Sequence, residues 1–154
     1  MSDAAPLAEV RRFLGLMTQG PPPTLTELIQ ALDELAASVH GAPEGDPSDS
    51  ELASPDRDWQ STYTALGSRF PGLGHYVTVE PLVLPPGEPV TGDAIDDLAD
   101  IVGDLEQVVW RYETLGADDA YWHLRFLFLI HWGQHLRELS LYLHALARND
   151  AIDA

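Results

Sequence analysis

Residues 94–115, AIDDLADIVGDLEQVVWRYETL, and residues 120–148, AYWHLRFLFLIHWGQHLRELSLYLHALAR, decide the fold of this chain. Apolar side chains recur at helical spacing in both stretches. The first has a predicted buried stripe of Ile95, Leu98, Val102, Leu105, Val109 and Tyr112, and the second a core line of Trp122, Leu129, Leu136 and Leu143. Gly116 leaves only a short link, so we expect two antiparallel helices that form a hairpin at the centre of the fold.

The N-terminal half adds three shorter helical patterns. One begins near Pro6, a second covers residues 25–39 behind a Thr24–Glu27 capping box, and a third follows Pro55 and ends before Pro71. Residues 42–54 predict a mobile acidic loop, and residues 74–92 an extended, proline-rich connection across the bundle surface. We therefore expect an all-α, single-domain helical bundle of about five helices over residues 1–154.

The composition limits the classes of partner. The chain has 154 residues, with 25 acids, eight arginines, no lysine and a formal charge of −17, so nucleic acid and anionic membranes are unfavourable partners. It has no cysteine, which excludes disulfides and thiolate metal sites and fits a reducing compartment. Residues 1–8 lack the pattern of a signal peptide, and no apolar run could cross a bilayer. We expect a cytoplasmic protein.

Two histidines one helical turn apart are the first candidate site. His131 and His135 stand at i and i+4 in His131-Trp132-Gly133-Gln134-His135, a spacing at which two rings can bind one metal ion. Trp132 stands where the zincin motif has glutamate, so metalloprotease chemistry is not supported. Two interpretations remain: histidines at the edge of the core that are bonded to acids of a neighbouring helix, or a divalent metal site.

A row of acids on the preceding helix is the second candidate. With the turn near Gly116, Asp97, Asp100 and Asp104 come level with the segment that holds the histidines. Arg125 stands at a core angle and needs an anion, so we expect a network of these acids with Arg125, His131 and His135. The alternatives are a solvated row of acids and an arginine whose guanidinium reaches solvent at the bundle end.

Three apolar side chains suggest a surface for a partner: Trp110, Ile130 and Leu141. Trp110 falls on the polar side of its helix, while the other two fall on the far side of the last helix. An exposed indole can anchor a protein partner. The alternative for Trp110 is that the segment from Tyr76 to Pro89 covers it.

The C-terminal hairpin resembles a known family. The run from Asp96 to Ile101, the pair Asp104-Leu105, and the segment from Trp122 to His135 resemble the bacterial "domain of unknown function 5063" family. The resemblance covers residues 94–146 and implies a small helical domain without an assigned activity. It also implies that the acids, Arg125 and the histidines stand at recurrent positions. Val102-Gly103 and Leu129-Ile130 depart from the pattern, which favours a packed hairpin over a catalytic site.

These observations support two functions from different classes. The first is a non-enzymatic binding or interaction module, with a protein or a second copy as its partner and no cofactor. The alternative is a metal-binding bundle in which His131 and His135, with Asp100 or Asp104, hold a divalent ion that activates a bound water. A purely structural network without a ligand is the third interpretation.

Overall fold

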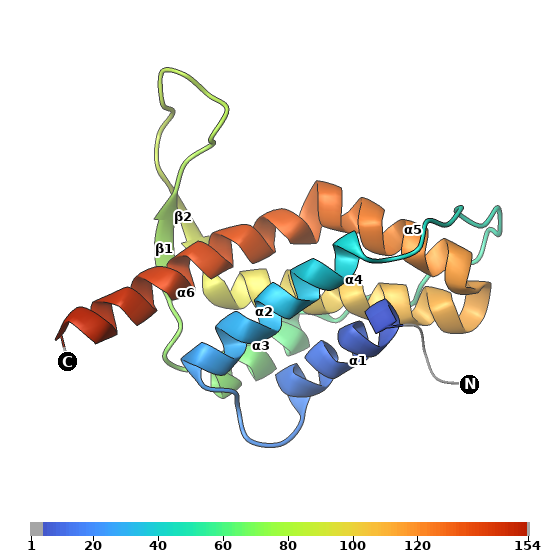
Figure 1. The fold of residues 1–154 in the computed structure, drawn as a ribbon, viewed down its shortest axis with the longest axis horizontal. Helices are drawn as coiled ribbons and strands as arrows, with labels where there is room; N and C mark the ends of the chain where they lie inside the picture. Colours follow the sequence, from blue (N-terminus) through green and yellow to red (C-terminus); the bar gives the residue numbers. More distant parts are fainter. Residues whose placement is uncertain (1–4, 154) are drawn as a thin grey trace.

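The computed structural model describes residues 5–153, with side chains as far as residue 151. Residues 1–4, half of the segment in which we expect no signal peptide, lie outside it. The elements in chain order are α1 (Ala5–Thr18), α2 (Leu25–His40), α3 (Trp59–Arg69), β1 (His75–Thr78), β2 (Val90–Asp93), α4 (Ala94–Leu115), α5 (Ala117–Leu127), the π-helical turn η1 (Phe128–Trp132) and α6 (Gly133–Asp153). The predicted all-α bundle is confirmed (Figure 1). Among the described residues, no helix is both long and apolar enough to span a membrane.

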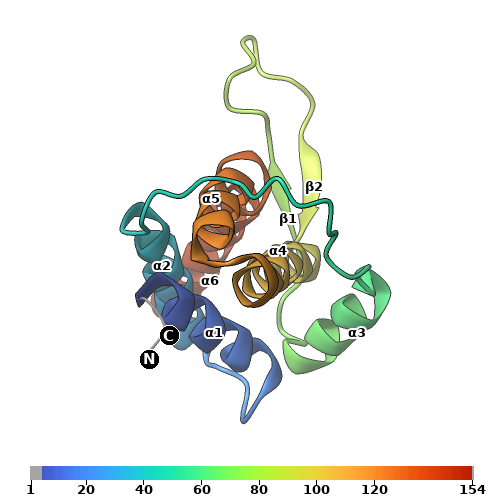
Figure 2. The same cartoon turned by 90° about the vertical axis from the view of Figure 1, so that its right-hand side faces the viewer.

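Helix α4 is the centre of the bundle (Figure 2). It contacts α1, α3, α5 and α6. Its first half is buried on nearly every side, and two of the side chains buried there are carboxylates, Asp97 and Asp104. Such burial requires a partner for each charge, so the fold itself places polar chemistry at the middle of α4.

Local signals begin α2 and α4 as the sequence predicts, whereas α3 begins only at Trp59, behind Asp58, and not directly after Pro55. Thr24 Oγ1 accepts from the Glu27 amide at 3.2 Å, and Glu27 Oε1 accepts from the Thr24 amide at 3.1 Å, which completes the capping box. Asp93 Oδ1 accepts from the Ile95 amide and begins α4. Gly116 joins α4 to α5 with a φ of 103°, a conformation that favours glycine. The C-terminal helical hairpin is present.

The last helix is interrupted, and this corrects its predicted core line. In η1 the carbonyl of Phe128 approaches Gly133 so closely that a Cβ there would overlap it. A π turn contains one residue more than an α-helical turn. The residues before it are therefore rotated relative to those after it, compared with a continuous α-helix. Leu129 is therefore 80% exposed and Trp122 is only half-buried, whereas the large buried side chains of this segment are those of Tyr121, Leu124, Trp132, Leu136, Leu139 and Leu143.

The proline-rich segment is extended but does not cross the bundle. It doubles back as an antiparallel hairpin in which Tyr76 pairs with Gly92, and the loop between the strands projects from the bundle (Figure 1). The strands contain no proline, whereas Pro81, Pro85, Pro86 and Pro89 lie in the loop. Proline has no N–H to donate to a strand partner, which explains this division.

The acidic loop has no regular structure but has fixed contacts. It passes from α2 towards α3 over the hairpin helices (Figure 2). The Ser48 amide donates to Asp119 Oδ1 at 2.8 Å, and Arg125 Nε donates to the Pro43 carbonyl at 3.3 Å. The mobility of residues 42–54 remains a prediction.

Candidate metal centre

The structure brings the acids of α4 against the histidines of the last helix. His131 Nδ1 lies 2.6 Å from Asp104 Oδ2, and His135 Nδ1 lies 2.7 Å from Asp97 Oδ1. The two imidazole rings are neighbours, with centroids 4.9 Å apart and planes nearly perpendicular. The predicted contacts between acids and histidines are therefore present.

The other ring nitrogens of both histidines face a third carboxylate. Asp100 Oδ2 lies 3.2 Å from His135 Nε2 and 3.9 Å from His131 Nε2. Within the described part of the chain, neither Nε2 makes a hydrogen bond of good geometry. Because an ionised carboxylate can only accept, Asp104 and Asp97 place a proton on each Nδ1. In the neutral ring, each Nε2 then keeps its lone pair on the side of Asp100.

Two further side chains hold the carboxylates, and sequence reasoning missed both. Arg57, from the segment before α3, places Nη1 3.4 Å from Asp104 Oδ1 and Nη2 3.4 Å from Asp100 Oδ1. Tyr76, from β1, donates its hydroxyl to Asp97 Oδ2. Both residues come from outside the C-terminal hairpin, so its periodicity contains no sign of them. Gly103 gave a local signal for Arg57, because it leaves the space that the Arg57 guanidinium fills.

Arg125 is not part of this network, and that prediction is wrong. Its guanidinium donates to the Pro43 carbonyl, and among the described residues it forms no ion pair with Asp100 or Asp104. Arg125 precedes the π turn, whereas the histidines lie within and after it. A regular helix would place Arg125 on the buried line of Leu136, and the extra residue of the π turn rotates it away from that line.

Burial and charge perturb the titration of several groups. Burial raises the pKa of Asp104, although its bonds to His131 and the charge of Arg57 oppose this. The hydrogen bond to Asp97 raises the pKa of His135 against the opposing effect of burial. Burial and then the hydrogen bond to Asp97 raise the pKa of the Tyr76 hydroxyl, which therefore stays protonated as a donor. Burial and the neighbouring Asp100 raise the pKa of Asp96.

One side of the cluster is open to solvent. The Asp97 and Asp104 side chains are almost fully buried, whereas that of His131 is 39% exposed and that of His135 is 23% exposed. A groove of about 360 Å³ begins at His135 and runs between the β hairpin and the helices α4 and α6. Its acidic side chains are Glu80, Asp93, Asp96, Asp97 and Glu138. The site thus has buried, hydrogen-bonded carboxylates at its bottom and an opening to solvent that is lined by acidic side chains.

The three predicted partner residues lie in different environments. Ile130 is 56% exposed and Leu141 is 72% exposed, as expected for the far side of the last helix. Trp110 is half-buried and lines a pocket with Arg57, Gln107 and the segment from Ser54 to Asp58. The segment beside Trp110 is therefore Ser54 to Asp58, and not the connection from Tyr76 to Pro89 that the sequence suggested.

Comparison with known proteins places the chain in a family. The family model described as "Domain of unknown function (DUF5063)" matches residues 8–149. The chain belongs to the DUF5063 family. The match extends far beyond the C-terminal hairpin, to which the resemblance in the sequence was confined. A search of the curated proteins finds no match to this chain.

A solved structure has the same fold as this DUF5063 chain. The crystal structure of protein BF1032 from Bacteroides fragilis matches with a TM-score of 0.68 and 19% sequence identity. The alignment covers 92% of this chain and 87% of BF1032. At this identity the similarity concerns the fold alone.

The segment His131-Trp132-Gly133-Gln134-His135 has a structural reason at each of its five positions in this DUF5063 domain. The two histidines face the acids of α4. Trp132 is completely buried, and Gly133 admits the Phe128 carbonyl into the π turn. Gln134 lies at the groove, where its amide donates to Glu138 Oε1 at 3.2 Å. The segment is thus both a packing element and part of the site.

Proposed function

We propose that this protein binds a divalent transition-metal ion through His131, His135 and Asp100. The observation that supports this most strongly is the orientation of the two imidazole rings. Each Nδ1 is bonded to its own buried carboxylate, and each Nε2 faces Asp100. Metal-binding histidines are held in this way, with the nitrogen that does not bind metal donating to a carboxylate or carbonyl.

The spacing of the three groups fits a shared ion. Atoms bound to one ion at about 2.0–2.2 Å lie about 3–3.5 Å from each other in tetrahedral or octahedral geometry. The 3.2 Å separation between His135 Nε2 and Asp100 Oδ2 is within this range, and the 3.9 Å separation for His131 requires a small adjustment. Asp104 is the less suitable third ligand, because it already accepts from His131 Nδ1.

The type of ligand narrows the kind of metal. Two imidazoles and one carboxylate suit zinc, iron(II), cobalt, nickel or copper better than magnesium or calcium, which prefer oxygen ligands. Three protein ligands leave coordination positions for water or for a bound molecule. Because the histidines are partly exposed, such a molecule could reach the ion from solvent.

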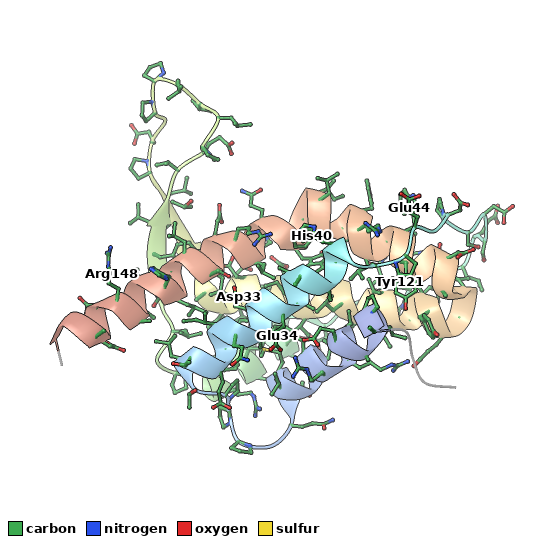
Figure 3. All side chains as sticks on the ribbon, in the orientation of Figure 1. Asp33, Glu34, His40, Glu44, Tyr121 and Arg148 are labelled. Carbon is green, nitrogen blue, oxygen red and sulfur yellow. The ribbon has the colours of Figure 1, made fainter. Side chains whose placement is uncertain are left out.

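The experiment is metal binding by protein prepared without a histidine tag. We expect one Zn²⁺ or Co²⁺ per chain in calorimetric titrations. His135→Gln and Asp100→Asn should each lower the affinity at least about tenfold. The matched controls are His144→Gln and Asp33→Asn, which change exposed residues of the same types elsewhere; Asp33 lies on α2 (Figure 3). Unchanged binding in both site variants, or no binding by the wild-type protein, would overturn the proposal.

A second function, protein interaction, is supported by exposed apolar side chains. The loop between the strands stands clear of the bundle (Figure 3). Within it Leu82 is 89% exposed and Leu84 is 84% exposed. On the last helix Leu129, Ile130 and Leu141 are exposed as well. A protein partner or a second copy of the chain could bury these groups. Bacterial origin and a cytoplasmic location are also proposals; they rest on the family resemblance and on the cysteine-free sequence.

A further inference from the structure

Tyr76 touches the candidate metal centre from the β hairpin. Its hydroxyl donates to Asp97 Oδ2, while the other oxygen of the same carboxylate accepts from His135 Nδ1 at 2.7 Å. Asp97 is only 3% exposed, so these two donors replace the water that a carboxylate would otherwise bind. The orientation of the carboxylate is therefore set by Tyr76 and His135 together.

The hairpin fixes the Tyr76 ring from several sides. In the strand register Tyr76 lies opposite Gly92, where a Cβ would overlap the ring. The ring also stacks on Tyr142 of α6, with centroids 5.2 Å apart and planes 22° apart. Tyr142 is held in turn, because its hydroxyl accepts from the Gly74 amide at 3.0 Å. The hydroxyl of Tyr76 thus reaches Asp97 from a ring with little freedom to move.

The two histidines differ in what supports their carboxylates. Asp104, which holds His131, has a charged neighbour in Arg57, whereas Asp97, which holds His135, has a neutral donor in Tyr76. Arg57 is partly exposed and approaches at 3.4 Å. Tyr76 is the closer and more rigid support, and it acts on one histidine only.

We propose that Tyr76 is a positioning residue of the metal centre, which fixes Asp97 so that His135 turns its Nε2 towards Asp100. This inference rests on the proposed function. Without the hydroxyl, Asp97 can rotate, and the His135 ring loses the acceptor that keeps the proton on Nδ1. Removal of such supporting groups typically weakens metal binding about 10–100-fold. The β hairpin is thereby linked to the metal, although it supplies no ligand.

The experiment compares Tyr76→Phe with Tyr142→Phe. Each variant removes one hydroxyl from the same pair of stacked rings, but only Tyr76 touches Asp97. In Zn²⁺ titrations we expect Tyr76→Phe to bind at least about tenfold more weakly than the wild-type protein, and Tyr142→Phe to bind within about twofold of it. Gly92→Ala, which displaces the Tyr76 ring, should behave like Tyr76→Phe.

A second measurement uses the metal-free protein. Nitrogen NMR of the histidine side chains, at a pH where the rings are neutral, reports which nitrogen carries the proton. We expect the Nδ1–H form of His135 to dominate in the wild-type protein and in Tyr142→Phe, and to decrease in Tyr76→Phe, with His131 unchanged. A general loss of structure would alter both histidines.

The outcomes separate this inference from the proposed function. Wild-type protein that does not bind Zn²⁺ removes the proposed function, and the proton position in His135 then decides alone whether Tyr76 positions that ring. The inference is overturned if Tyr76→Phe keeps the wild-type form of His135. Equal losses of Zn²⁺ affinity in the two tyrosine variants would overturn it as well, because the stacked pair would then matter only as packing.

Discussion

The guanidinium group of Arg57 lies directly on Gly103, in the space that a side chain at position 103 would fill. From there it reaches Asp100 and Asp104, the residues three before and one after Gly103 on α4. Because Gly103 has no side chain, Arg57 from a distant segment can pass over it and reach the acids of the central helix.

A double-mutant cycle tests this relationship. Arg57→Ala alone should cost about 1 kcal/mol, because the guanidinium is partly exposed and its ion pairs are long. Gly103→Ala displaces the flexible end of Arg57 but gains about 1 kcal/mol of helix propensity, so its net effect should be small. In the Gly103→Ala background, Arg57→Ala should cost nothing measurable by urea denaturation. The same cost in both backgrounds would show that the two residues are independent.

Gly133 should be intolerant of even one methyl group. A Cβ at this position would overlap the Phe128 carbonyl, which belongs to the backbone of the π turn and cannot move freely. We expect Gly133→Ala to destabilise the protein by about 1–3 kcal/mol. The control is Gly15→Ala in α1, where a Cβ meets nothing within 4 Å and helix propensity should stabilise by up to about 1 kcal/mol. Changes in melting temperature of the same sign in both variants would argue against this close approach of the Phe128 carbonyl to Gly133.

The helices of this fold follow from local patterns, and so do the contacts between acids and histidines. The Thr24 capping box, the glycine at 116 and the three- and four-residue spacings are all local, so they predict α2, α4 and their neighbours directly. The short link fixes the register of the hairpin, and this register brings Asp97 and Asp104 to the histidines.

The remaining features depend on a helix irregularity and on long-range contacts, neither of which the local periodicity of the sequence predicts. The π turn adds one residue within an otherwise regular pattern, which misplaces Leu129 and Arg125 in any prediction that assumes a continuous α-helix. Arg57 and Tyr76 arrive from a loop and a β hairpin that are far from the acids in sequence. Two glycines inside regular elements, Gly103 in α4 and Gly92 in β2, give a sequence signal for such a close approach.

The stability of the metal-free protein should fall as the pH rises. The pKa values of Asp96, Asp104, Glu106 and His135 are all raised in the folded chain, the first three by burial and the last by its bond to Asp97. The folded state then holds protons that the unfolded state has released, so the free energy of unfolding decreases with pH. This stabilisation is complete below the unfolded pKa values and is lost as the pH passes the raised ones.

Urea denaturation in the presence of a chelator provides the measurement. We expect a smaller free energy of unfolding at about pH 8 than at about pH 6, an interval set by His135, whose pKa is raised from the ordinary value of 6.5. The carboxylates with lowered pKa values, such as Glu27 and Asp58, titrate below the ordinary carboxyl range and so do not offset this trend. A protein that is more stable at the higher pH would contradict the assigned directions.

Hydrogen exchange should be fast through the acidic loop except at one amide. Residues 42–54 have few apolar side chains to bury, so little compensates the entropy of ordering them. The Ser48 amide, however, donates to the buried Asp119 carboxylate. We expect Ser48 to exchange more slowly than its neighbours and to lose this protection in Asp119→Ala. Uniformly slow exchange over residues 42–54 would show that the loop is not mobile.

Anomalous diffraction from crystals soaked in Zn²⁺ or Co²⁺ tests the central claim most directly. We predict one strong anomalous peak between α4 and the last helix, within about 2.0–2.2 Å of His131 Nε2, His135 Nε2 and an Asp100 oxygen. The Nδ1 atoms should remain bonded to Asp104 and Asp97. The absence of a peak at this position in soaked crystals that leave the site open to solvent, or an ion bound elsewhere with both histidines unchanged, would contradict the metal centre.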